Sequence, residues 1–210
     1  MTKLLDLTPQ RRDTILNAAL KEFSSKGYDV ASTNVIAKEA GISKALMFHY
    51  VSSKQELFLV VYDYFSELLK HEYFELMNYD AKDIFDRLRQ SYLLQIKLSE
   101  KYPWILDFNK LSRITNSNEV NEELENRTHK EYSSCYPNLF DEIDEGKFKV
   151  GLDIEKCKQF ILWANVGFTN EILENIRNSE SPAINYEFVV EKIDGYFDEL
   201  RKVFYTPGNE

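Results

Sequence analysis

The chain has 210 residues, of which 43% are hydrophobic and 29% are charged. This composition is typical of globular proteins and excludes a disordered or fibrous chain, and the length is sufficient to bury a large core. Only seven Gly and five Pro residues interrupt the sequence, which favours long helices over a turn-rich β fold.

Positive charge is concentrated at the N-terminal end of an acidic chain. The formal net charge is −9, which argues against a protein that coats nucleic acid through bulk positive charge. Residues 1–54, however, hold eight Lys and Arg against five Asp and Glu, a net charge of +3, which leaves −12 for residues 55–210. A basic head on an acidic body is expected where only one end of the molecule meets phosphate.

No segment predicts export or insertion into a membrane. Asp6 interrupts the N-terminal stretch where a signal peptide needs an unbroken apolar run, and no apolar run approaches the ~20 residues of a membrane span. Cys135 and Cys157 lack the spacing of a metal site or a disulfide framework, so we interpret them as inert buried thiols. We therefore expect a cytoplasmic protein without a membrane partner.

The first predicted helix begins at Thr8 and Pro9, an N-cap residue followed by proline at the first helical position. Leu16, Leu20 and Phe23 have the spacing of a helix with one buried face. Gly27 is expected to end this helix, because glycine is the usual residue of a left-handed C-terminal cap.

Two short helices are predicted next. The first is capped by Ser32 or Thr33 and ends at Gly41, and its inward-facing residues are expected to be Val35, Ile36 and Ala40. Ser43 caps the second, which runs to about Tyr50. Helices this short bury little surface alone, so they are expected to pack on the first helix as a three-helix unit.

Six longer helices are predicted after residue 53. Ser53 and Glu56 form a capping box at the start of one that runs to about Met77. The others are expected at about residues 81–100, 103–113, 119–145, 154–178 and 185–204, and Pro137 should bend or split the helix in which it lies. The predicted fold is all-α with about nine helices, divided into an N-terminal three-helix domain at residues 1–54 and a helical domain at residues 55–210.

Residues 33–50 have the layout of a helix-turn-helix, with a tight turn around Gly41. The second helix of such a motif needs small or polar residues at its N-terminal end to enter the major groove, where its amide groups also receive phosphate. Ser43, Lys44, Ala45 and Leu46 occupy this end. On spacing alone, a short-helix corner within an α-helical core is the competing interpretation.

The pair Ile36-Ala37 is followed by Ala40-Gly41-Ile42-Ser43, by an aromatic-rich turn at residues 48–50, and by Ser53-Lys54-Gln55-Glu56-Leu57. In these residues and their spacing the chain resembles the TetR family of bacterial transcription regulators. The match covers about a quarter of the chain. The rest agrees in length, in helical content and in the Glu-Gly-Lys-Phe turn at residues 145–148.

The resemblance implies a set of DNA-contacting residues: Thr33, Ser43, Lys44, Ala45, Leu46, His49, Tyr50 and Lys54. Ala45 and Leu46 would contact thymine methyl groups, Lys44 would reach guanine or a phosphate, and Lys54 would bind a backbone phosphate. Two positions depart from the family pattern. Ala45 stands where Gly is frequent, and Phe48 stands where Tyr often contacts phosphate, so Tyr50 or His49 would supply that hydrogen bond instead.

The resemblance also implies a pocket for a small-molecule effector in the helical body. The candidate lining residues are Tyr62, Phe65, Tyr92, Ile96, Trp104, Phe108, Phe160 and Trp163. We expect the group around Tyr102, Trp104 and Trp163 to form a cavity wall, and we expect an apolar or aromatic effector. The competing interpretation is that these side chains belong to an ordinary core.

The last two predicted helices carry apolar stripes that would form a four-helix homodimer interface. The candidate interface residues are Phe168, Ile172, Val189, Ile193, Phe197 and Leu200. Two heads held about 34–36 Å apart would read a pseudo-palindromic operator. The alternative is that both stripes face the body of their own chain.

The predicted function is a ligand-responsive repressor of the bacterial cytoplasm, located on the nucleoid when bound to DNA; activation is the open alternative. A second alternative is a helical protein that binds a small molecule and has weak or lost operator binding. No enzyme, cofactor or metal site is predicted, because His49, His71 and His129 are scattered and no nucleotide-binding or hydrolase motif occurs.

Overall fold

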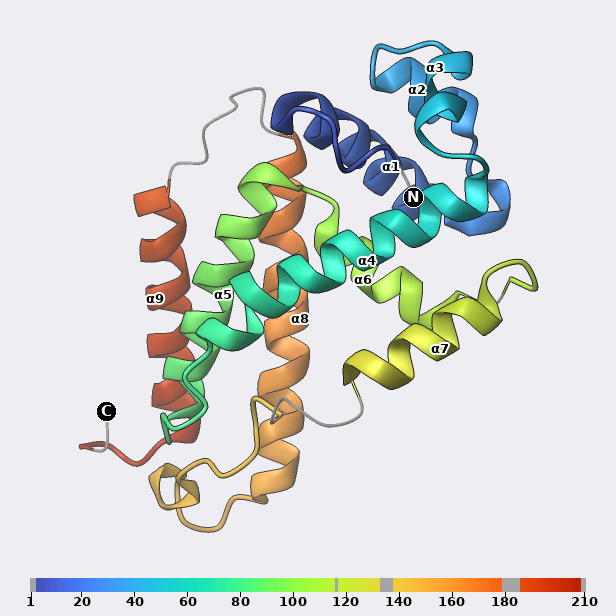
Figure 1. The fold of residues 1–210 in the computed structure, drawn as a ribbon. Coiled ribbons are helices and arrows are strands. Elements are labelled where there is room, and N and C mark those ends of the chain that lie inside the picture. The colour runs from blue at the N-terminus through green and yellow to red at the C-terminus, as the bar shows by residue number, and fades with distance from the viewer. Residues whose placement is uncertain (1–2, 116, 133–137, 179–185, 209–210) are drawn as a thin grey trace. The chain divides into compact units, whose positions relative to one another are not determined.

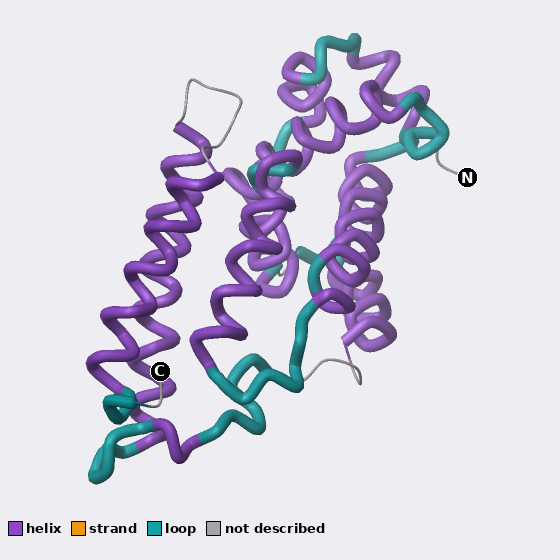
Figure 2. Tube along the Cα trace, turned by 90° about the vertical axis from the view of Figure 1, so that its left-hand side faces the viewer, coloured by secondary structure: helices purple, strands orange, loops and turns teal. Residues whose placement is uncertain are grey.

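The computed structural model describes residues 3–115, 117–132, 138–178 and 186–208. Within these ranges every element drawn in Figures 1 and 2 is a helix or a loop, and β pairing is limited to one bridge between Phe148 and Tyr205. The predicted all-α class is therefore confirmed.

The described α-helices are α1 (Pro9–Val30), α2 (Thr33–Glu39), α3 (Lys44–Tyr50), α4 (Lys54–Glu72), α5 (Ile84–Lys101), α6 (Ile105–Ile114), α7 (Asn121–Tyr132), α8 (Ile154–Asn178) and α9 (Tyr186–Phe204). Short 3-10 helices lie at η1 (Phe74–Leu76) and η2 (Glu145–Lys147). Two expected helices are shorter than predicted. The one expected to reach Met77 ends at Glu72, and the one expected at 119–145 is described only at Asn121–Tyr132; Pro137 lies outside the described residues.

The chain divides into two compact units. The first contains Met1–His71 and Tyr102–Cys135, and the second contains Glu72–Lys101 and Tyr136–Glu210. The first unit thus combines the N-terminal helices with α4, α6 and α7, whereas the second combines α5, α8 and α9. The functional boundary expected at residue 54 is a different division and stays a prediction.

Aromatic side chains from three helices form the core of the first unit. Phe23 of α1 meets Phe58 of α4 edge-on at a centroid distance of 5.0 Å, and Phe58 lies 5.4 Å from Phe108 of α6. All three rings are fully or almost fully buried. Burial of side chains of this size is a large stabilising contribution, because each removes well over ~100 Å² from water.

Gly27 interrupts α1 as predicted, although the helical segment continues to Val30 on the far side of the kink. Gly27 has φ and ψ of 73° and 167°, a conformation that costs glycine little and other residues much more. The α1 axis is therefore broken just before Tyr28, whose ring is buried.

The predicted capping box at α4 forms in a modified way. The Ser53 side chain accepts a hydrogen bond from the amide of Glu56 at 3.0 Å, as a capping serine should. The Glu56 carboxylate, however, accepts from the amide of Ser52 at 2.6 Å, one residue before the expected partner. The start of α4 is thus fixed by both halves of the motif.

The core of the second unit lies between α5, α8 and α9, which pack on one another. Phe85 and Tyr92 of α5 meet Phe197 of α9 at centroid distances of 5.9 and 5.7 Å, and Tyr92 also meets Phe168 of α8 at 5.6 Å. The end of the chain is tied back by the Phe148–Tyr205 bridge.

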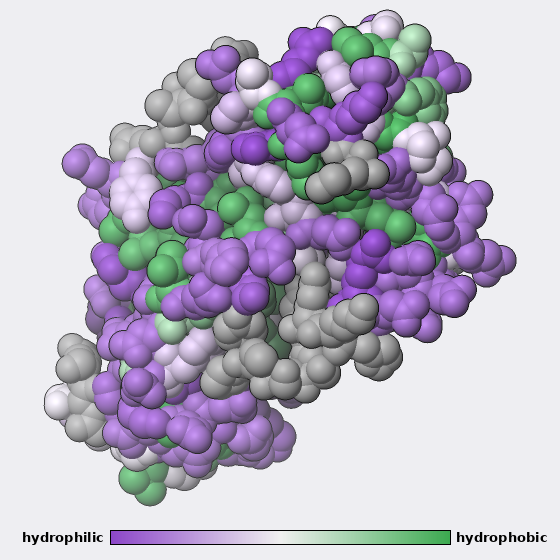
Figure 3. Space-filling view, viewed as in Figure 1, coloured by the Kyte–Doolittle hydropathy of each residue, from purple (hydrophilic) through white to green (hydrophobic). Residues whose placement is uncertain are grey.

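The face of the protein in Figure 3 is predominantly hydrophilic, with apolar residues gathered in small areas between charged ones. A charged fraction of 29% is enough to produce such a surface. None of the described helices combines the length and the apolar character that crossing a membrane would require.

Candidate nucleic-acid interface

The turn between α2 and α3 is closed around Gly41. Its φ of 63° lies in the left-handed region that favours glycine. The amide of Ile42 donates to the carbonyl of Ala37 at 2.9 Å, which satisfies a carbonyl at the end of α2. The Ser43 hydroxyl oxygen then accepts from the amide of Leu46 at 3.1 Å and caps α3. These bonds fix the angle at which α3 leaves the turn.

Helix α3 packs against α2 through one buried side. Met47 is fully buried, and so are Ile36 and Ala37 of α2 and its C-cap residue Ala40. Val35, which was predicted to face inward, is 45% exposed. It precedes the buried pair of α2, and the ~100° turn of each helical residue carries it toward solvent.

Four of the eight predicted DNA-contacting residues are exposed at α3 or at its N-cap. Ser43, Lys44, Ala45 and His49 are exposed, and Thr33, Leu46 and Tyr50 are half-buried. Phe48 is 37% exposed, and its ring centroid lies 6.0 Å from the Nζ atom of Lys44. The exposed side of α3 therefore presents a cation, a methyl group and an aromatic ring, which are groups suited to phosphate and to base edges.

Lys54 is placed differently from the remaining predicted contacts. Its ammonium group donates to the carbonyls of Tyr28 and Asp29 at 3.0 and 3.1 Å and lies 4.6 Å from the centroid of the Tyr28 ring. Lys54 therefore caps the end of α1, where the kink at Gly27 leaves carbonyls to be satisfied. An ammonium group has three donors, and these bonds use two of them.

The candidate effector-binding residues of the first unit lie in or beside its core. Tyr62, Phe65 and Phe108 are buried, and Trp104 is half-buried at the start of α6. Phe65 meets Tyr102 edge-on at 4.9 Å. Burial, together with hydrogen bonds to Tyr64 and Asp13, raises the pKa of Tyr102, so that its hydroxyl remains a donor.

In the second unit the candidate effector-binding residues separate into two groups. Tyr92 and Ile96 are buried in the core, where the Tyr92 hydroxyl donates to the carbonyl of Asn165 at 2.8 Å. Phe160 and Trp163 are 50% and 59% exposed and stack edge-on at 5.7 Å. Both rings thus lie apart from the buried Cys157 and Ile161 of α8. The cavity wall expected around Tyr102, Trp104 and Trp163 stays a prediction.

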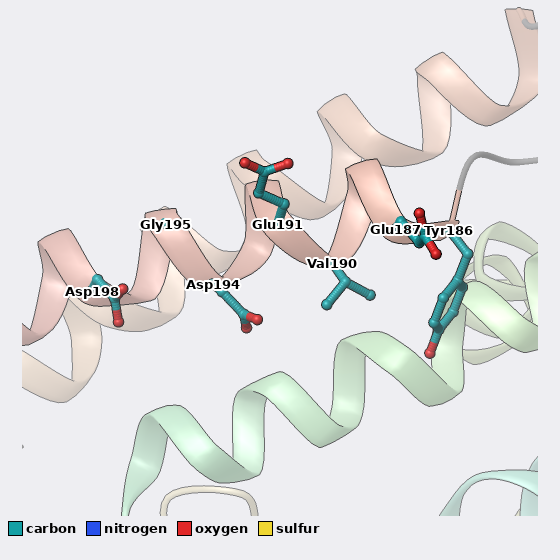
Figure 4. Close-up of a pocket in the computed structure, with 7 residues that line it drawn as sticks. All are labelled: Tyr186, Glu187, Val190, Glu191, Asp194, Gly195 and Asp198. Atoms are coloured by element: carbon teal, nitrogen blue, oxygen red, sulfur yellow. The ribbon is translucent and has the colours of Figure 1, made fainter.

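A groove that no predicted residue lines runs along α9. Its lining residues are Tyr186, Glu187, Val190, Glu191, Asp194, Gly195 and Asp198. Figure 4 shows Tyr186, Val190 and Asp194 directed from α9 toward α5, and Asp194 pairs there with Arg89. The carboxylates recur at helical spacing, which is a signal that the sequence carried. Their negative charge excludes this groove as a phosphate-binding surface.

The predicted dimer residues lie in the core of their own chain. Phe168, Ile172, Ile193 and Phe197 are buried, and Val189 and Leu200 pack against them partly buried. This corresponds to the alternative in which both stripes face the body. A different apolar surface is exposed on α8, formed by Phe160, Leu162, Trp163 and Val166.

The described residues contain no group of three or more His, Cys, Asp or Glu side chains positioned to hold a metal ion. Cys157, one of the two cysteines expected to be inert, is buried, and this burial raises the pKa of its thiol. Cys135 lies outside the described residues.

A short helix, a turn closed at a left-handed glycine and an exposed second helix define a helix-turn-helix protein. Residues 15–61 match the family model described as bacterial regulatory proteins, tetR family. The match covers the helix-turn-helix segment of the chain, and over this segment it confirms the resemblance seen in the sequence.

Curated relatives are similar to the chain over different lengths. The uncharacterized HTH-type transcriptional regulator YuxN of Bacillus subtilis is 26% identical over 192 residues, which are 90% of this chain and 54% of that protein. The HTH-type transcriptional activator FasR of Mycolicibacterium smegmatis is 42% identical over 52 residues, 25% of this chain and 24% of that protein. The chain thus spans about half the length of YuxN.

Solved structures share the fold over almost the whole chain. A TetR family transcriptional regulator from Chloroflexus aurantiacus has a TM-score of 0.57 at 17% identity, with 97% of each chain covered. The ketosteroid transcriptional regulator KstR2 of Mycobacterium tuberculosis has a TM-score of 0.58 at 16% identity, with 95% of this chain and 97% of that chain covered. At such identities the likeness extends to the fold alone.

Proposed function

We propose that the chain is a transcription regulator that binds operator DNA through α3. The observation that carries this proposal is the geometry of α3, which is anchored through Met47 and leaves Lys44, Ala45 and His49 exposed on one side. The net charge of +3 on residues 1–54 supports it, because the rest of the chain is acidic.

The test is a selection of duplexes from a random DNA library with the full chain, followed by affinity measurements on the recovered sequence. We expect selective binding that weakens steeply between about 50 and 200 mM salt. Lys44→Ala should weaken binding by about 1–3 kcal/mol if it contacts a guanine, or reduce the salt slope by about one if it contacts a phosphate. Lys70→Ala, which removes an exposed lysine of α4, is the matched control. Recovery of no preferred sequence would favour the alternative of a helical protein without operator binding.

The proposed regulator works as a homodimer. The supporting feature is the exposed face of α8 that Phe160, Leu162, Trp163 and Val166 form, because a cluster of large apolar side chains at a surface is typical of an interface. Next to it Gly167 has no atom within 4 Å of the position of an added Cβ, which leaves room for a helix of a second copy. Two heads would then read the pseudo-palindrome.

Trp163→Glu tests this interface by sedimentation of the full chain. A charge in the middle of the apolar face should convert a dimer into monomers, whereas Leu76→Glu, an exposed apolar position in η1, should leave the dimer intact. A wild-type chain that sediments as a monomer, or a Trp163→Glu variant that remains dimeric, would contradict the proposal.

We further propose that the chain is a repressor that an apolar or aromatic molecule releases from DNA. The aromatic residues of the first unit, Tyr62, Phe65 and Phe108, support an effector of this chemistry. The test is a thermal-shift screen with aromatic molecules and their charged analogues, followed by DNA release. A reporter placed behind the selected operator separates the two modes, because loss of the protein raises expression under a repressor and lowers it under an activator.

A further inference from the structure

The connector between α6 and α7 is bonded to both elements that flank the α2–α3 pair. The Tyr28 hydroxyl donates to the Glu119 carboxylate at 2.5 Å, and Ser117 donates to the Asp29 carboxylate at 2.7 Å. The Gln55 side chain donates to the backbone carbonyl of Glu119 at 2.5 Å. Three hydrogen bonds thus join residues 117–119 to the end of α1 and the start of α4.

Tyr28 links this connector to Lys54. Its hydroxyl end is held by Glu119, while its ring face and its carbonyl receive the Lys54 ammonium group. The ring is only 2% exposed and packs edge-on against Phe58 at 5.2 Å. One rigid side chain therefore connects a surface carboxylate at the α6–α7 connector to a cation at the N-terminus of α4.

We propose that the α6–α7 connector sets the position of Lys54 through Tyr28, so that Tyr28 and Glu119 are positioning residues for the DNA-binding surface. This inference rests on the proposed function. A rearrangement of α6 or α7 that withdraws Glu119 releases the far end of the Tyr28 ring, and the ammonium group loses the surface that orients it.

The geometry favours a role in orienting the Lys54 ammonium group over a role limited to holding the helices together. A lysine side chain loses much rotamer freedom when it is fixed, so an ammonium group aimed at a phosphate gains from being held in advance. The two carbonyls take two of the three N–H donors of Lys54, and under the proposal the third binds a phosphate. Asp29 contributes on the same side, since its carbonyl accepts from Lys54 and its carboxylate from Ser117.

Tyr28→Phe and Glu119→Ala test the proposal in the full chain, with the duplex recovered by selection. Both remove the hydroxyl–carboxylate bond, and we expect DNA binding to weaken about five- to tenfold, the effect of about one hydrogen bond. The slope of log affinity against log salt should fall by about 0.9 in each head, the value for one lost phosphate contact. Glu119→Gln keeps an acceptor oxygen for the Tyr28 hydroxyl and should restore most of the affinity.

Tyr64→Phe is the matched control, because it removes a hydroxyl that also forms a hydrogen bond in the first unit, to Tyr102 at 3.3 Å. It should change neither the affinity nor the slope. A second comparison removes dependence on the stability of Tyr28→Phe. In a Lys54→Met background, Glu119→Ala should cause no further fall in slope, because the cation that it positions is already gone.

The results separate failure of this inference from failure of the proposed function. A wild-type chain that selects no DNA sequence overturns the proposed function and with it this inference. A wild-type chain that binds selectively, with Glu119→Ala matching its salt slope, overturns the positioning role alone. An equal loss of slope from Glu119→Ala in the wild-type and Lys54→Met backgrounds also overturns it.

Discussion

Asp83 and Lys147 form an ion pair of 2.6 Å in the second unit, although 64 positions separate them in the sequence. Asp83 is 6% exposed and also accepts from the amide of Phe85 at 2.8 Å, which caps α5. Arg201 lies 3.6 Å from the same carboxylate. Burial alone would raise the pKa of Asp83, but these hydrogen bonds and the two positive charges outweigh it and hold the pKa below its ordinary value.

The Asp83 pair predicts a contribution to stability that acid removes. Because the pKa is lower in the folded state than in the unfolded state, the contribution is complete above the ordinary Asp pKa of about 3.9 and is lost as the pH falls through the folded-state pKa. Asp83→Asn should lower the free energy of unfolding at neutral pH by about 1.5–3 kcal/mol, since it removes the buried charged hydrogen-bond partner of Lys147. Denaturant unfolding of both proteins from about pH 7 to pH 2 checks this, and the difference between them should shrink in acid.

Asp86→Asn is the control for this experiment. Asp86 pairs with Arg201 at 2.7 Å, but 62% of its side chain is exposed. Exposed pairs contribute about 0–1 kcal/mol, so this variant should follow the wild-type curve. If both variants lost the same stability, or if the Asp83→Asn difference stayed constant in acid, the assignment to Asp83 would be wrong.

Arg87 gives a second prediction on stability. It is 1% exposed, and its guanidinium group donates to the carbonyls of Tyr79, Ala81, Leu139 and Asp141. Two loops distant in the sequence are thus held by one planar group with a fixed set of donors. Arg87→Lys keeps the charge but cannot reach all four carbonyls, and we expect it to lower the free energy of unfolding by about 2–3 kcal/mol.

Arg89→Lys on the same helix is the comparison for Arg87→Lys. Arg89 pairs with Asp194, and both side chains are about two-fifths exposed. Denaturant titration should place the Arg89 variant within about 1 kcal/mol of the wild type. A larger loss at Arg89 than at Arg87 would show that the carbonyl contacts contribute little.

The starts of α1 to α4 could be predicted because local signals mark them, whereas the end of α4 was missed by five residues. Pro9, Gly41, Ser43 and the Ser53–Glu56 box each act within a few residues of themselves, and the structure places the helix boundaries beside them. The long helices α8 and α9 were also predicted within one residue of their described ends, because sustained apolar periodicity is a strong signal.

The partner of each apolar stripe could not be predicted in the same way. Phe168 and Phe197 have the spacing of an interface, but periodicity gives the side of a helix and not the surface that it meets. The family resemblance placed Phe160 and Trp163 in a pocket lining, and their spacing did not indicate that both would be exposed. The bonds of Lys54 and Arg87 to carbonyl groups depend on the path of the folded backbone, so no residue pattern indicated them.

Gly41 provides a prediction on backbone conformation. Its φ of 63° strains the backbone of other L-residues, although Asn and Asp tolerate this conformation better than the rest. No atom lies within 4 Å of an added Cβ. Gly41→Ala should therefore cost about 1–2 kcal/mol from strain alone, with no clash, and Gly41→Asn should cost less. Thermal unfolding followed by circular dichroism measures both variants.

Gly195→Ala is the opposite case and serves as the control for Gly41→Ala. Gly195 lies within α9 with no atom within 4 Å of an added Cβ, so alanine should stabilise the protein by about 1 kcal/mol through helix propensity. The interpretation fails if the two alanine variants shift the melting temperature in the same direction.

Phe48 gives a prediction on DNA affinity, because it departs from the tyrosine that the family often has at this position. The ring is 37% exposed beside Lys44, so a hydroxyl group can be added without disturbing the core. If α3 enters the major groove as proposed, Phe48→Tyr adds a donor at the phosphate backbone, and binding should tighten about five- to tenfold, the effect of about one hydrogen bond. Phe48→Leu keeps an apolar side chain without the ring or the donor, and it should bind no more tightly than the wild type.

Affinity measurements on the selected duplex compare the three proteins. Unchanged or weaker binding by Phe48→Tyr would mean that residue 48 lies away from the backbone, and that His49 or Tyr50 supplies the phosphate hydrogen bond.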